Sequence, residues 1–345
     1  MKRQLFLVML VLSFCWGGFA RAADSEPESG KSRGSLVLYF ANDLFYDTDK
    51  YYTNAVQIRY ITPSLDLFPT VAPPEGRSAG PETQPPKVRE YFMSFGAGQA
   101  LFTPENTATT ELQKNDRPYA AHLYGFAALH IKRPMTMDTA ELSLGVVGPS
   151  ALGEAAQNEI HRLRGFELAK GWRNQLHDEP ALMLTWTRNY RLNEEAGAIG
   201  WGWDLLPYHS LTAGNVLTQA AVGAEVRYGW NLPGDFTTSV IRPGSGIDAS
   251  ATNPALQRKN DGWGWYVFAG AEGRAIAHTI FLDGNTWTDS HSIEKRPLVG
   301  EVSAGVALLI SGMRITYQHV YMTKEFRAQK GGGQNYGSIT LTIPF

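Results

Sequence analysis

Apolar and polar residues alternate along twelve segments of the chain, with the period of two that is typical of β-strands. In one segment Leu182, Leu184 and Trp186 share a face, and Thr185 and Thr187 lie on the other. Such strands suit a barrel wall that separates lipid from a polar lumen. The twelve segments are residues 35–42, 53–62, 90–98, 119–131, 137–147, 180–191, 199–212, 215–230, 263–277, 297–311, 313–325 and 336–345. The pattern predicts an all-β fold, a transmembrane antiparallel β-barrel of about 12 strands, which is an even number as in single-chain bacterial barrels.

A secreted β-sandwich is the soluble alternative, because its strands also alternate. The chain has 9 Trp, 15 Tyr and 16 Phe, and its last strand ends on Phe345, like the C-terminal signature of bacterial outer-membrane barrels. These features favour the barrel. We expect four tryptophans to anchor it in an interfacial girdle, namely Trp201, Trp203, Trp263 and Trp265. The formal net charge of −2 gives no argument for a nucleic-acid partner.

The first 22 residues are typical of a secretory signal peptide, with Lys2 and Arg3 before an apolar run that ends in an A-x-A pattern at Ala22. The only cysteine, Cys15, lies in that run, so the mature chain has no disulfide to stabilise it. No later run of eighteen apolar residues predicts a membrane-spanning helix. We therefore expect residues 23–345 to form a single outer-membrane barrel domain in bacteria, with polar loops at 63–89 and 233–261.

One stretch departs from the strand pattern and predicts a short helical segment near 152–174. If it is helical, Gln157 and His161 are four residues apart and share a face. Both side chains can then point at one substrate. Taken alone, His161 is more simply interpreted as a surface histidine on a connecting helix.

Oxygen-bearing side chains gather after the first predicted strand, at Asn42, Asp43, Asp47 and Asp49. Hard oxygen donors suit calcium, but the spacing does not match an EF-hand loop and also fits a polar turn. Thr53 follows at the start of the next predicted strand, and the alternation there places it among the lumen-facing residues.

A second polar pair, Asp116 and Arg117, precedes the fourth predicted strand. We interpret it as a salt-bridged strand start in preference to a chemical site.

Four segments of the chain together resemble the outer-membrane lipid A deacylases, the LpxR-type barrel proteins. They are ANDLFYDTDKYYTNAVQIRY, NDRPYAAHLYGF, VVGPSALGEAAQNEIHRLRGFELAKGWRNQL and TKEFRAQ with the final strand. The resemblance implies a twelve-stranded barrel, active near its outer rim, that removes the 3′-linked acyloxyacyl group of lipid A with calcium. It also implies that lipid A or lipopolysaccharide is the partner, and we expect a monomer.

The same resemblance implies roles for individual residues. His161 is the expected general base, Gln157 its neighbour in the site, and Glu167 a further functional carboxylate. Asn42 and Asp43 match the calcium-associated residues, and Thr53 matches a hydroxyl residue of the same pocket. The chain has no G-x-S-x-G elbow for a competing serine triad.

The chain departs from the family pattern at a lysine expected in the loop after the third strand. Either Lys114 or Arg117 replaces it, or the substrate is placed differently. This departure favours an alternative, a non-enzymatic outer-membrane barrel that is structural or a small pore and has an open, water-filled lumen. A secreted soluble hydrolase is a more distant third hypothesis.

Overall fold

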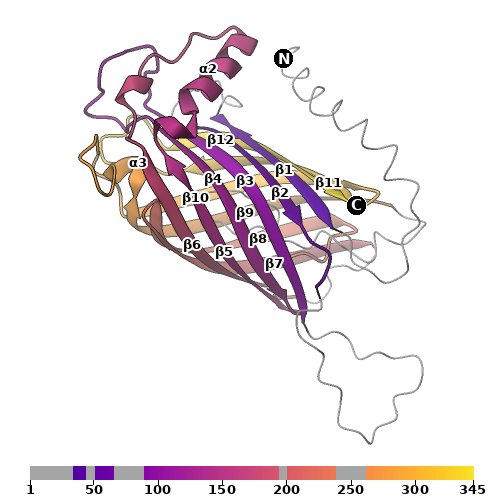
Figure 1. Ribbon diagram of the computed structural model, residues 1–345. Coiled ribbons are helices and arrows are strands. Elements are labelled where there is room, and N and C mark those ends of the chain that lie inside the picture. The colour runs from indigo at the N-terminus through magenta and orange to yellow at the C-terminus, as the bar shows by residue number, and fades with distance from the viewer. Residues whose placement is uncertain (1–33, 44–50, 66–88, 194–199, 238–261) are drawn as a thin grey trace, which may run out of the picture.

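Twelve antiparallel strands close into one barrel in a computed structural model of the chain (Figure 1). The structure describes residues 34–43, 51–65, 89–193, 200–237 and 262–345. The predicted signal peptide, Asp47, Asp49 and most of the two long polar loops lie outside these described residues. The predicted fold and the number of strands are confirmed.

The strands are β1 (Ser35–Asn42), β2 (Tyr51–Ile61), β3 (Glu90–Thr103), β4 (Ala120–Lys132), β5 (Thr136–Val147), β6 (Glu179–Tyr190), β7 (Trp201–Gly214), β8 (Leu217–Trp230), β9 (Trp263–Thr279), β10 (Leu298–Ile310), β11 (Met313–Met322) and β12 (Gln334–Pro344). The short helical elements are η2 (Pro149–Ala151), α2 (Gly153–Arg164), η3 (Trp172–Asn174) and α3 (Ile280–Asp283). None of the helices in the described residues is long and apolar enough to cross a membrane.

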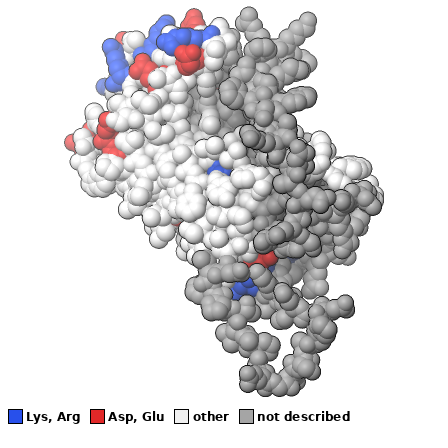
Figure 2. All heavy atoms as spheres, turned by 45° about the vertical axis from the view of Figure 1, so that its right-hand side comes forward, with Lys and Arg blue, Asp and Glu red and all other residues white. Residues whose placement is uncertain are grey.

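Alternation along each strand separates an apolar outer wall from a polar lumen. On β6, Leu184 is 55% exposed to the outside, whereas the adjacent Thr185 is 4% exposed and bonds to Thr212 across the lumen face. Charged side chains are sparse over the middle of the wall in Figure 2 and gather at the upper end. This band is the surface that a bilayer would cover.

The two ends of the barrel differ. Ser35 pairs with Pro344 at one end, which we call the termini end. Trp201, Trp203 and Trp263 are exposed there, and Trp201 contacts Trp265 edge to face at 5.7 Å between ring centroids. This placement is that of an aromatic girdle, as predicted. The opposite end carries α2 and α3, and we call it the helix end (Figure 1).

Aromatic rings fill the lumen at the helix end. Phe102 of β3 stacks on Phe281 of α3 with ring centroids 4.0 Å apart. Tyr52 packs against both Phe102 and Tyr336, and all four side chains belong to one buried cluster. Side chains of the described residues therefore occupy this part of the lumen.

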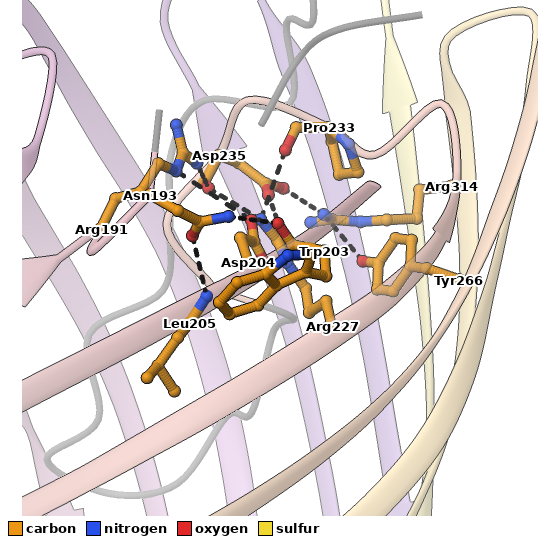
Figure 3. Close-up of polar contacts among 10 residues, drawn as sticks. All are labelled: Arg191, Asn193, Trp203, Asp204, Leu205, Arg227, Pro233, Asp235, Tyr266 and Arg314. Carbon is orange, nitrogen blue, oxygen red and sulfur yellow. Dashed lines mark hydrogen bonds and ion pairs between the residues drawn. The ribbon is translucent and has the colours of Figure 1, made fainter. Parts of the chain in front are cut away.

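An ion-pair network fills the lumen at the termini end (Figure 3). Arg227 donates from Nε to Asp204 at 2.8 Å and from Nη1 to Asp235 at 2.5 Å. Asp235 comes from the segment between β8 and β9 and also accepts from Arg314 and, through its backbone carbonyl, from Arg191. The described start of this segment, residues 231–237, lies inside the barrel, where Asp235 and Phe236 are almost completely buried.

Candidate active site

Helix α2 runs from Gly153 to Arg164, and the residues that flank it, Leu152 and Gly165, both have left-handed backbone angles. At its end the amide of Phe166 donates to the carbonyl of His161 at 2.9 Å, which turns the chain back along the helix. The helical segment predicted near 152–174 is thus confirmed as α2 and η3, with a turn between them.

The buried face of α2 is polar. Gln157 and His161 are 2% and 3% exposed, and Asn158 beside them is also buried, whereas Leu163 is 67% exposed. A surface helix normally buries its apolar side chains. The reversal indicates that these polar groups are retained for a purpose other than packing.

Trp172 of η3 fixes Gln157. The indole Nε1 donates to Gln157 Oε1 at 2.7 Å, and Trp172 is fully buried. Because the amide oxygen accepts this bond, the flip state of Gln157 is set and its amide nitrogen is identified as the donor atom.

His161 is held by a backbone carbonyl. Its Nδ1 lies 2.5 Å from the carbonyl oxygen of Glu167. A carbonyl oxygen only accepts hydrogen bonds, so Nδ1 carries the hydrogen in the neutral ring. Nε2 is then the basic nitrogen, as a general base requires.

Glu167 lies after the end of α2, and its carboxylate is exposed. The contact that the structure gives to the His161 ring uses the backbone of Glu167 and not its side chain. A catalytic role for the carboxylate therefore stays a prediction.

The site lies on the outer face of the barrel wall. Phe102 points into the lumen cluster, so the preceding residue, Leu101, points outward by strand alternation. Leu101 packs with Tyr119 and Trp172 in a separate buried cluster. Gln157 and His161 are therefore attached to the lipid-facing side of β3 and β4, at the helix end.

Thr53 also lies on this outer side, and its predicted lumen parity was wrong. The pairing of β2 with β3 skips a residue between Tyr52 and Asn54, which places Thr53 in a bulge. Its hydroxyl lies 2.7 Å from that of Thr103, which shares the outward parity of Leu101. A bulge re-aims one side chain, and sequence parity does not reveal it.

Asn42 and Asp43 end β1 at the same end of the barrel, and both are buried. Asn42 is paired with Asn54 of β2, and Asn54 is paired with Leu101 of β3. Since paired residues share a face, Asn42 continues the outward row that reaches Leu101 and Trp172. Asn42 and the wall residue that Trp172 covers thus lie in one outward row across three neighbouring strands.

The donor chemistry at Asn42 and Asp43 fits calcium. An amide oxygen and a carboxylate are hard ligands, and a buried carboxylate needs a cation or hydrogen-bond donors to be stable. In the part of the chain that the structure describes, no group of three or more His, Cys, Asp or Glu side chains could hold a metal. These two residues would therefore need further oxygens, from backbone, hydroxyl groups, water or substrate.

Neither candidate for the missing lysine is placed on this outer row. Lys114 is exposed in the loop after β3. Arg117 is buried, pairs with Glu325 at 2.9 Å and lies over the lumen ring of Phe102. The predicted salt bridge at this strand start is formed by Arg117, but with Glu325 as its acid. The Asp116 carboxylate instead accepts hydrogen bonds from the backbone amides of Glu105 and Arg117.

Sequence reasoning missed three residues of the site. Trp172 and Asn158 lie inside the motif that we singled out, and the reversed polarity of α2 was the available signal. Thr103 contacts Thr53 from fifty positions away, so only the register of β2 against β3 reveals it.

The comparisons with known proteins agree with this fold. A family model described as "Outer membrane protein LpxR" matches residues 5–345. LpxR from Salmonella typhimurium is a similar solved structure, with 21% identity, a TM-score of 0.69, and coverage of 90% of this chain and 100% of that one. The β domain of the Bordetella autotransporter BrkA follows at 9% identity and a TM-score of 0.41, covering 92% and 100%. No curated protein sequence matches the chain. Because the family model spans nearly the whole length, the chain belongs to the LpxR family of outer membrane proteins.

Proposed function

We propose that the chain is an outer-membrane lipid A deacylase that hydrolyses the 3′-linked acyloxyacyl ester, with His161 as general base. The observation that carries this proposal is the hydrogen bond from Nδ1 of the buried His161 to the Glu167 carbonyl. It sets the tautomer that can take a proton from water, on the face of the wall where an acylated lipid lies.

The chemistry follows from the polar side chains on this face. His161 Nε2 accepts a proton from water as the water attacks the ester carbonyl, and afterwards returns it to the departing alkoxide. Gln157, whose side chain is fixed by Trp172, would donate an amide hydrogen to a substrate oxygen. Calcium held by Asn42 and Asp43 would supply positive charge for the carbonyl oxygen. Thr53 and Thr103 would add two hydroxyl groups, which lie 2.7 Å from each other.

The surrounding surface suits a lipid substrate. Below α2, toward the middle of the barrel, the outer wall exposes three leucines of β4 and β5, namely Leu123, Leu142 and Leu144. Acyl chains in the outer leaflet can lie against these residues while the sugar headgroup reaches α2. Access from the membrane needs no passage through the lumen.

The activity is tested with the purified barrel, lipid A and calcium, with the products resolved by mass spectrometry. We expect a free acyloxyacyl acid and a lipid A lighter by that group.

We also propose export through a signal peptide cleaved after Ala22, a single barrel domain at 23–345, and a monomer in the outer membrane.

Calcium removal should strongly slow turnover, because a Lewis acid contributes several kcal/mol to stabilising the transition state. We expect an excess of EGTA to lower the rate on the order of 100-fold, reversibly on adding calcium. Asp43→Ala should raise the calcium concentration needed for half-maximal activity. Asp289→Ala, which removes an exposed carboxylate at the helix end, is the matched control. Full activity in EGTA would contradict the calcium requirement.

The pore alternative predicts an open lumen, whereas described side chains occupy both ends of it. We expect the reconstituted wild-type protein to give no steady conductance in planar bilayers. A stable ohmic channel of uniform size would instead favour the pore. If the protein were instead recovered in the soluble fraction and its gel mobility did not change on heating, as that of barrels does, a secreted hydrolase would be favoured.

A further inference from the structure

Asn158 is buried on α2 beside Gln157, yet the chemistry above gives it no part. Its Oδ1 accepts a hydrogen bond from the backbone amide of Ala169 at 3.0 Å. Ala169 is itself buried with Leu101 and Trp172 against the outer wall. Asn158 therefore attaches the chain that leaves α2 back onto the helix.

The attached segment carries the carbonyl that holds His161. Its start is fixed where Phe166 donates to the carbonyl of His161, and its end is fixed where Ala169 donates to Asn158. Glu167 lies between these two points, and its carbonyl oxygen meets His161 Nδ1. The position of the Glu167 carbonyl is therefore set by the hydrogen bonds at both ends of this segment.

We propose that Asn158 is a positioning residue for His161, acting through the backbone of residues 166–169. Its carboxamide oxygen holds this segment so that the Glu167 carbonyl keeps the ring in one orientation with hydrogen on Nδ1. This inference rests on the proposed function of His161 as general base. It assigns Asn158 no contact with substrate.

The test compares variants of the full-length barrel on lipid A with calcium present. Asn158→Ala removes the acceptor, and we expect kcat to fall roughly 10- to 100-fold, because a small misplacement of a catalytic group costs about that much. The KM for lipid A should stay within about twofold of the wild-type value, since Asn158 does not contact substrate. Asn158→Asp keeps an acceptor oxygen for the Ala169 amide, so its kcat should recover to within about threefold of wild type.

Two further variants complete the design. Asn158→Leu keeps the side-chain volume without the acceptor and replaces the alanine variant if that fails to fold, as judged by heat-modifiable mobility. Asn174→Ala removes a hydrogen bond from the same region to the Thr110 carbonyl, and should keep the wild-type kcat.

Three results would overturn the inference: a wild-type kcat in folded Asn158→Ala or Asn158→Leu, an equal loss in Asn158→Asp, or a change confined to KM. The proposed function fails separately, if wild type releases no acyloxyacyl acid or if His161→Ala remains active. Normal wild-type activity, a dead His161→Ala and an unaffected Asn158→Ala would leave the function standing and remove only the role of Asn158.

Discussion

His161→Ala should lower the rate of lipid A deacylation by roughly 100- to 10,000-fold, the range that a positioned general base contributes. Alanine removes Nε2, so no side chain at that position takes the proton from the attacking water. The Glu167 carbonyl also loses its hydrogen bond from Nδ1. The rate is best measured as kcat, on purified protein with saturating calcium and lipid A.

His177→Ala is the matched control for this variant. His177 is an exposed histidine in the segment between η3 and β6, on the same side of the barrel, and its side chain takes no part in the proposed site. We expect it to keep wild-type kcat. A folded His161→Ala protein with more than a tenth of wild-type kcat would remove His161 as the base and leave the LpxR-family fold unaffected.

Asp235→Ala should destabilise the barrel by about 3–5 kcal/mol, which is the usual cost of removing one partner of a buried ion pair. Asp235 bonds both Arg227 and Arg314 inside the lumen, and all three side chains are at most 5% exposed (Figure 3). Arg227 keeps its ion pair with Asp204, whereas Arg314 loses the carboxylate of Asp235. The free energy of unfolding can be measured in denaturant, in detergent micelles, by tryptophan fluorescence.

Glu159→Ala is the comparison for this second variant. It breaks the pair that Glu159 forms with Arg162 on α2, in which both side chains are about 60% exposed. Exposed pairs contribute about 0–1 kcal/mol, so we expect little change. If Asp235→Ala were as stable as Glu159→Ala, the ion pairs of Asp235 with Arg227 and Arg314 would not stabilise the barrel.

The alternating pattern predicted the barrel well because each strand is constrained on both faces. Leu184 and Thr185 are adjacent yet meet lipid and lumen, so the period of two is enforced along the whole wall. Strand ends are less constrained. The third strand was predicted to end at 98 and continues to Thr103, which is the residue that meets Thr53.

The site was only partly predictable, because its geometry depends on contacts between segments that are distant in the sequence. Gln157 and His161 could be paired from helix geometry, since they are separated by one turn. Their placement on the outer wall depends on Trp172 packing against Leu101, a contact between distant segments. The bulge at Thr53 reversed the parity that the alternation predicted. Local periodicity therefore fixes the faces of a strand, whereas contacts between loops and wall decide which face carries the chemistry.

Mass spectrometry of lipid A from cells that make the wild-type chain, the His161→Ala variant or neither is the most direct test of deacylation at this outer-wall site. We predict that lipid A loses the mass of the 3′-linked acyloxyacyl group only in cells with wild-type protein, and only with calcium present. Unchanged lipid A in those cells, with the folded barrel in the outer membrane, would contradict the account.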